Sequence, residues 1–119
     1  MADKLSNTLS DHIANLLNWN FQEEKTGTGT VTLHANAKEY LFLLKYGNNS
    51  GEQALGFEWT LPASETTNKT HTLTSGYELS ASSYCFAQIQ IQNGVVQITG
   101  LTINGTDLKS TSILRIYYR

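Results

Sequence analysis

The pair Asn93-Gly94 is the feature that most restricts how this chain can fold. Asn-Gly is the preferred pair for a two-residue type I′ turn, which joins two antiparallel strands. A turn here places apolar residues opposite one another on one face and polar residues on the other. The predicted pairs are Ile91 with Val96, Ile89 with Ile98, Gln90 with Gln97, and Gln88 with Thr99. Turn and pattern agree, so the sequence predicts a half-buried hairpin.

Farther from this turn, the same register moves apolar side chains to the outer face. It places Phe86 opposite Leu101 and Tyr84 opposite Ile103. Apolar residues on both faces predict a cover over the outer one. The N-terminal segment or a second subunit would supply that cover.

The rest of the chain also predicts β-structure. It contains 15 Thr, 10 Asn and 9 Gly, residue types that favour strands and turns, while only 15% of its residues are charged. Tyr40 to Tyr46 is apolar on both faces and predicts a central strand, and Pro62 closes the next strand. Further strands are expected over 26–33, 70–74, 77–80 and 112–118. We expect an antiparallel, jelly-roll-like β-sandwich of seven to eight strands over residues 26–119.

Residues 1–22 have a different pattern, which predicts a short amphipathic helix ending near Asn18. A helix of this length is marginally stable alone in water, so it must dock on the sandwich or associate with copies of itself. The apolar stripe has 4-4-3 spacing, close to a heptad seam, and two arrangements are open: the helix folds back over its own sandwich in a monomer, or three helices form a bundle in a homotrimer. The expected oligomerisation residues are Leu5, Leu9, Ile13 and Leu16.

Composition restricts the partners. A net charge of −2 and a pI near 5.8 argue against a nucleic-acid partner. A single cysteine excludes an internal disulfide framework. The sequence lacks a signal-peptide pattern and an apolar run of about 20 residues, so we expect neither signal-dependent secretion nor membrane insertion.

The sequence contains no recognisable catalytic or metal-binding motif, so we expect a protein without enzymatic activity, metal or other cofactor. His12, His34 and His71 are widely separated and form no metal-binding pair. Cys85 lies in phase with Ile89 and Ile91, which indicates a buried thiol rather than a nucleophile. The carboxylates Glu23, Glu24 and Glu58 have no evident partner, and a carbohydrate-active hydrolase stays open only because such partners are often distant in sequence.

Two polar loops are the expected ligand-binding regions, over residues 47–53 and 64–69. Their amide and hydroxyl side chains suit polyhydroxylated ligands. The candidate binding residues are Asn48, Asn49, Ser50, Glu52, Thr66 and Asn68. Trp59 is expected to pack in the core with Phe57 and Leu61 rather than to form a sugar-stacking platform.

Several segments together resemble a known group of modules. They are the strand Glu39 to Tyr46, the aromatic strand ending in Leu61-Pro62, the Gly76-Tyr77 segment, and the terminus ILRIYYR over 113–119. This layout resembles the C-terminal head modules of tail-fibre and baseplate proteins from prophages of Gram-positive gut bacteria. The resemblance covers about residues 26 to 119. A usual tail fibre is much longer and carries a shaft, whereas here only a short predicted helix precedes the head, so two expectations are open: a fragment of a longer fibre or a small stand-alone protein.

The resemblance implies an all-β, trimeric head that recognises a bacterial surface polysaccharide without catalysis. It also implies other phage tail proteins as partners and a location in the virion tail or in the cytoplasm of the producing bacterium. An alternative is a structural subunit of a phage tail or other assembly that binds no glycan.

Overall fold

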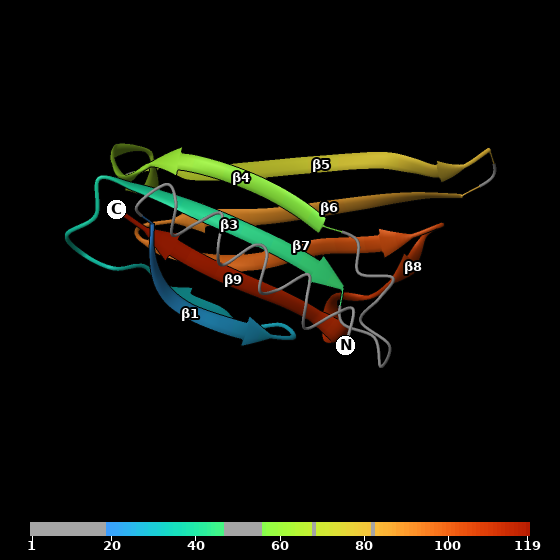
Figure 1. Ribbon diagram of the computed structural model, residues 1–119, viewed down its shortest axis with the longest axis horizontal. Helices are drawn as coiled ribbons and strands as arrows, with labels where there is room; N and C mark the ends of the chain where they lie inside the picture. The colour runs from blue at the N-terminus through green and yellow to red at the C-terminus, as the bar shows by residue number, and fades with distance from the viewer. Residues whose placement is uncertain (1–18, 47–55, 68, 82) are drawn as a thin grey trace.

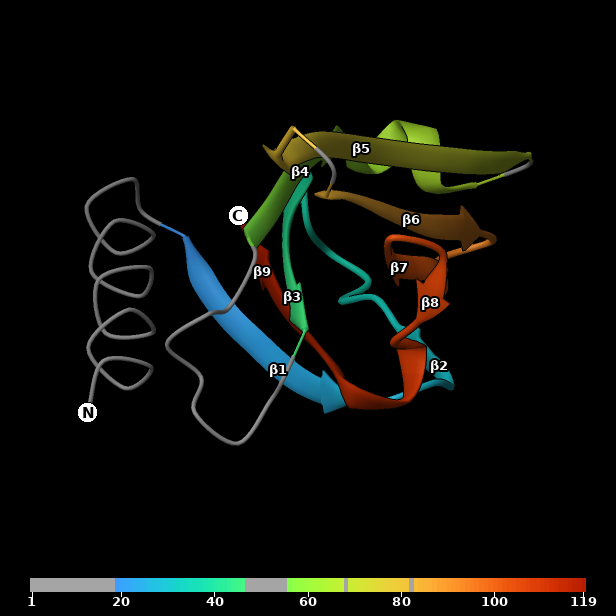
Figure 2. The ribbon, with the colours of Figure 1, turned by 90° about the vertical axis from the view of Figure 1, so that its right-hand side faces the viewer.

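The computed structural model describes residues 19–46, 56–67, 69–81 and 83–119. These residues form two mainly antiparallel sheets packed face to face (Figure 1), so the predicted all-β sandwich is confirmed. Figure 2 shows the strands of the two sheets on opposite sides of the core. The predicted N-terminal helix, which ends near Asn18 and carries Leu5, Leu9, Ile13 and Leu16, lies outside the described residues.

Sheet A contains four strands in the order β1-β9-β3-β4. Its strands are β1 (Asn20–Thr26), β3 (Glu39–Tyr46), β4 (Gly56–Pro62) and β9 (Ser112–Tyr118). β3 is central, as its apolar faces predict, and β4 ends at Pro62 as expected. β9 lies between β1 and β3, so strands from opposite ends of the described chain are neighbours.

Sheet B has the order β2-β7-β6-β5, and the short β8 pairs with β7. Its strands are β2 (Thr30–Thr32), β5 (Thr70–Ser80), β6 (Ser83–Gln92), β7 (Val95–Ile103) and β8 (Thr106–Asp107). Two short 3₁₀ helices, η1 (Ala63–Thr66) and η2 (Lys109–Thr111), connect the sheets at β4 to β5 and at β8 to β9. The predicted jelly-roll-like order stays a prediction.

Apolar side chains from the inner faces of both sheets form the core. Phe42, Ile89, Val96, Leu101 and Ile116 are completely buried. Cys85 is 2% exposed and belongs to the same cluster, as its phase with the isoleucines predicts.

The predicted hairpin at Asn93-Gly94 is confirmed. Both residues have a positive φ, 52° and 74°, as a type I′ turn requires. The pairs Ile91 with Val96, Ile89 with Ile98, and Gln90 with Gln97 form as expected. The turn is anchored from both sides, because the amide of Gly94 donates to the carbonyl of Thr66 and its carbonyl accepts from the amide of Leu33.

Beyond Ile89 the predicted register is wrong by one residue. A bulge shifts the pairing, so that Ala87 lies opposite Leu101 and Phe86 opposite Thr102. The extra residue lets Ile98 and Leu101, which are three positions apart, both face the core. Leu101 is therefore buried and Ile103 half-buried, whereas Tyr84 and Phe86 are exposed.

The described residues form nine strands rather than seven or eight, for two reasons. The strand expected over 26–33 is divided by a turn at Gly27 and Gly29, whose φ angles are 80° and 128°. β1 precedes this turn in sheet A and begins at Asn20, six residues before the expected start of the sandwich, while β2 follows it in sheet B. The strands expected over 70–74 and 77–80 form one strand, β5, but the two-residue β8 is additional.

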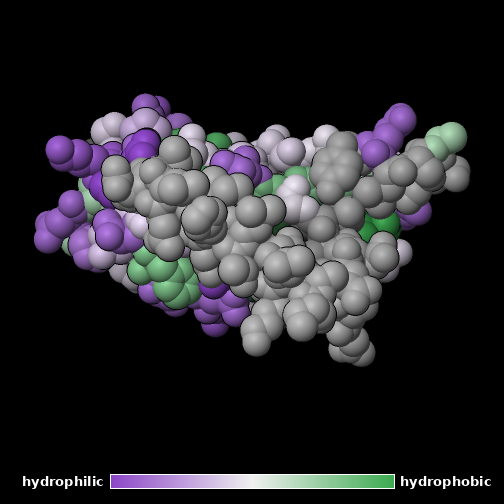
Figure 3. Space-filling view, viewed as in Figure 1, coloured by the Kyte–Doolittle hydropathy of each residue, from purple (hydrophilic) through white to green (hydrophobic). Residues whose placement is uncertain are grey.

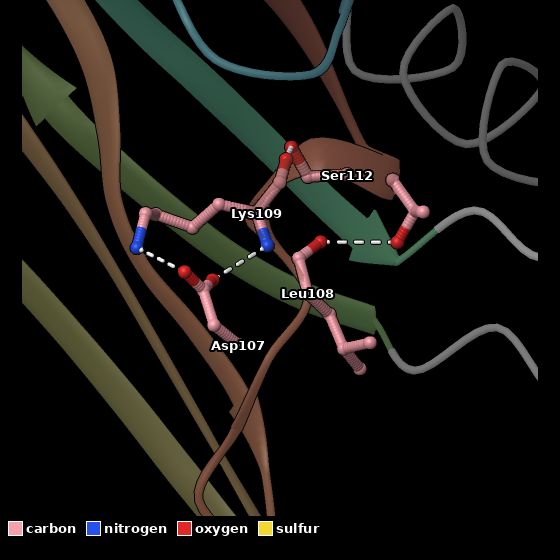
Figure 4. A network of polar contacts seen from close by, with 5 residues as sticks. Asp107, Leu108, Lys109 and Ser112 are labelled. Carbon is pink, nitrogen blue, oxygen red and sulfur yellow. Dashed lines mark hydrogen bonds and ion pairs between the residues drawn. The ribbon is translucent and has the colours of Figure 1, made fainter.

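A polar network shapes the connection from β8 to β9 (Figure 4). The carboxylate of Asp107 accepts from the backbone amide of Lys109 at 2.9 Å and from its ammonium group at 2.8 Å. The hydroxyl of the buried Ser112 donates to the carbonyl of Lys109 at 2.7 Å. These bonds satisfy the polar groups of η2 where the chain crosses between the sheets.

Candidate functional site

The outer surface of sheet B is an uncharged hydrogen-bonding surface, which we call the Gln/Thr face. Its side chains alternate with the buried isoleucines and valines of the core, so they point to solvent. All of them are exposed or half-buried. The outward residues are Thr30, Thr32, Thr70, Thr72, Thr74, Gln88, Gln90, Gln92, Val95, Gln97 and Thr99.

Cross-strand contacts order the centre of this face. The side-chain amide of Gln97 donates to the amide oxygen of Gln90 at 3.4 Å. The hydroxyl of Thr99 donates to the amide oxygen of Gln88 at 3.2 Å. An amide side chain has two N–H donors and one acceptor oxygen, so each glutamine keeps bonding capacity for a ligand.

A hollow of about 200 Å³ lies on the Gln/Thr face near the hairpin turn. Four of its lining residues are polar and uncharged, and Val95 supplies an apolar patch. The lining residues are Thr30, Gln90, Gln92, Val95 and Gln97. The hollow spans three neighbouring strands, β2, β7 and β6, which fixes the spacing of these groups.

Two exposed aromatic side chains, Tyr84 and Phe86, stand at the other end of β6. They are 55% and 37% exposed. The ring of Phe86 lies over Gly100 of β7, where an added Cβ would come within 3.0 Å of the ring atom Cε1. A reciprocal pair of bonds holds the strand here: the amide of Tyr84 donates to the side chain of Asn104, and the amide of Asn104 donates to the carbonyl of Tyr84.

Charge lies at the ends of this surface. At the aromatic end, Glu78 pairs with Tyr84 in the β5–β6 ladder, and Asp107 pairs with Thr102 in β8. Asp107 forms an ion pair with Lys109, with Nζ and Oδ2 2.8 Å apart, and the hydrogen bonds from Lys109 hold the Asp107 pKa below its ordinary value. Lys69 flanks the opposite end, ahead of β5.

Of the six predicted ligand-binding residues, Thr66 lies within the described residues. Asn48, Asn49, Ser50, Glu52 and Asn68 lie outside the described residues. Thr66 is 3% exposed, and its hydroxyl donates to the carbonyl of Ala63 at 2.7 Å. Its environment is that of a turn residue beneath the β6–β7 hairpin.

Trp59 packs against the core, as expected, and its indole N–H donates to the carbonyl of Thr74 at 3.3 Å. This bond links the adjacent edges of sheets A and B. The sequence identified the outward positions of Gln88, Gln90 and Gln97 but did not identify them as a site. The sequence pattern that could have identified the site is the run of polar, uncharged residues on one face of three strands.

The outer face of sheet A has a different character. Trp19, Leu41 and Tyr117 form a second buried cluster there, and the guanidinium of Arg119 lies 4.3 Å from the ring centre of Trp19. Figure 3 views the molecule from this side, and its visible described surface mixes hydrophilic and hydrophobic patches. Phe21, 51% exposed, packs edge-on against Tyr117.

The ionisable side chains offer no metal site within the described ranges, where no group of three or more His, Cys, Asp or Glu residues converges. Glu65 lies 2.8 Å from His71 and 3.5 Å from Lys69. The hydrogen bond from His71, with the positive charge of Lys69, lowers the pKa of Glu65. This cluster stabilises the end of η1, next to the start of β5.

Comparisons with protein-family models, curated proteins and solved structures found no match to this chain. Among the described residues, no helix has the length and apolar character needed to cross a bilayer.

Proposed function

We propose that this protein is a non-catalytic recognition module that binds a bacterial surface polysaccharide. The observation that carries the proposal is the Gln/Thr face: an uncharged set of amide and hydroxyl groups with a hollow and two exposed aromatic rings. Sugars present many hydroxyl groups and have apolar C–H faces. Amides bond the hydroxyls, and aromatic rings contact the apolar faces.

The resemblance to prophage tail-fibre head modules supports the same proposal. In that setting the module lies in the virion tail, or in the cytoplasm of the producing bacterium before assembly, and other tail proteins and two further copies of the chain are its partners. The loop residues Asn48, Asn49, Ser50, Glu52 and Asn68 stay candidates for additional contacts, and Leu5, Leu9, Ile13 and Leu16 for trimer formation.

A binding assay on purified polymers tests the proposal. We expect the intact protein to bind at least one surface polysaccharide isolated from Gram-positive gut bacteria, in affinity electrophoresis or calorimetry. The double variant Gln90→Ala/Gln97→Ala should bind more weakly than the wild type. Glu58→Ala, on an exposed position of sheet A, serves as a matched control. Absence of binding to every such polymer would contradict the proposal.

The second candidate is a structural subunit that uses the aromatic end as a protein contact. Tyr84 and Phe86 favour it, because exposed aromatic side chains are typical of protein interfaces. A pull-down that recovers a tail component, combined with no glycan binding, would support this alternative. Loss of that recovery in Tyr84→Ser would assign the contact to the aromatic end.

A further inference from the structure

The chemistry along β6 points to one class of ligand. Resting on the proposed glycan recognition, we propose that the ligand is an uncharged polysaccharide that lies along β6, with one sugar ring stacked on Phe86 and its neighbours bonded to Gln88, Gln90 and the hollow. Phe86, Gln88, Gln90 and Gln92 alternate outward along one strand. They span about 20 Å, which suits an extended chain rather than a single small molecule.

The position of Phe86 makes it a platform rather than a core residue. Its cross-strand partner on β7 is Thr102, but two glycines also lie next to it, its partner Gly76 on β5 and Gly100 on β7. Neither has a side chain to stand beside the ring, and the ring packs over Gly100. The ring is thereby supported from below and is 37% exposed, so an apolar sugar face can bury it.

The backbone under the platform is fixed before a ligand arrives. The amide of Tyr84 and the side chain of Asn104 are joined at 2.8 Å, and the return bond from the amide of Asn104 measures 2.9 Å. At the other end, the Asn93-Gly94 turn is tied to Thr66 and Leu33. A preorganised surface loses little conformational freedom on binding, which favours affinity for a flexible polymer.

Charge selects against acidic polymers. The outward residues of the Gln/Thr face include no ionisable side chain among those described. Two carboxylates flank the aromatic end, Glu78 opposite Tyr84 and Asp107 opposite Thr102, and they would repel uronate or phosphate groups, although Lys109 offsets Asp107. A neutral ligand avoids this repulsion and needs no desolvation of a charge.

The test compares polymers of different charge on the intact protein. The neutral probes are soluble β-glucan, mannan and the neutral wall polysaccharides of Gram-positive gut bacteria, and the anionic probes are polygalacturonate and wall teichoic acid. We expect binding to a neutral polymer that changes less than twofold between 20 and 500 mM NaCl, because no ion pair contributes.

Variants then locate the contact. We expect Phe86→Ala to weaken binding about tenfold and Gln90→Ala several-fold, because truncating an aromatic anchor removes most of its buried contact. Phe86→Tyr should keep the affinity within about threefold. Phe21→Ala removes a more exposed ring from sheet A and should leave binding unchanged.

A measurement on the wild type covers the case in which Phe86→Ala fails to fold. In NMR titrations with the bound polymer, the side-chain amide signals of Gln88, Gln90 and Gln97 and the backbone signal of Gly100 should shift, whereas the backbone signals of Phe21 and Glu58 should not. Neutral-polymer binding without these shifts, or binding restricted to anionic polymers, would overturn the inference and leave glycan recognition standing. Absence of binding to every polymer would overturn both.

Discussion

At the scale of single residues, the two Asn-Gly turns set the geometry of sheet B. Asn93 and Gly94 have φ angles of 52° and 74°, and Asn104 and Gly105 have 51° and 83°. Asparagine and glycine adopt this left-handed region with little strain, unlike most residues. The sequence could therefore locate both turns, because each depends on two adjacent residues alone.

Gly94→Ala should lower the free energy of unfolding by about 1 kcal/mol, because alanine is strained at a positive φ. An added Cβ meets nothing within 4 Å at Gly94 or at Gly56, but only Gly94 has a positive φ. Gly56→Ala is thus a matched control and should be neutral or slightly stabilising. Urea denaturation measures both. Equal effects of the two substitutions would mean that the turn strain is unimportant.

Acid should weaken the fold through Glu65 and Asp107. Their pKa values are lowered from 4.5 and 3.8, chiefly by the hydrogen bonds from His71 and Lys109 respectively. A carboxyl whose pKa is lowered by folding stabilises the folded state at pH values above its pKa in the unfolded chain. This contribution is lost as the pH falls through the pKa of the folded state. Chemical denaturation from pH 6 to pH 2.5 should show stability falling below about pH 4.5. Asp107→Asn should flatten the slope, and a slope identical to the wild type would contradict this assignment.

At the scale of elements, hydrophobic alternation gives the face of each residue but not the extra residue of a bulge. The pairing of β6 and β7 was predictable as far as Ile89, because the turn and the pattern agree there. Past that point Ile98 and Leu101 both face the core, and only the packed structure shows which strand bulges. The same limit applies to the site, because the sequence cannot show that β2 lies beside β7 and completes the hollow.

The two glycines beside Phe86 should respond differently to alanine. At Gly76 an added Cβ would lie 2.8 Å from the backbone carbonyl of Cys85, which cannot move without disturbing the ladder. At Gly100 it would meet mainly the Phe86 ring, a side chain that can rotate. Gly76→Ala should therefore lower the free energy of unfolding by about 2 kcal/mol, and Gly100→Ala should lower it distinctly less.

Thermal denaturation measures the loss of stability in the two variants, and a glycan-binding assay gives a second comparison between them. Gly100→Ala should weaken binding because it tilts the platform. A Gly100→Ala protein that is less stable than Gly76→Ala would show that the ring is held rigidly.

At the scale of the molecule, the sequence predicts that the N-terminal segment determines the association state. Light scattering should show a trimer for the intact chain, and Leu9→Asn/Ile13→Asn should weaken association, because both residues belong to the predicted apolar seam. A truncated chain must begin at Trp19, since Trp19 packs on Leu41 and Tyr117, and β1 starts at Asn20. An intact chain that stays monomeric at high concentration would contradict the trimer.

The place of β9 has a consequence for how the molecule is made. β9 is synthesised after every other described strand, yet it fills the slot between β1 and β3. Until it emerges from the ribosome, those two strands have no neighbour on the facing sides, and their backbone groups form open edges. A β9 from another copy fits that slot as well as the chain's own. Newly made chains at high local concentration are therefore open to strand exchange, a hazard that ends when β9 docks.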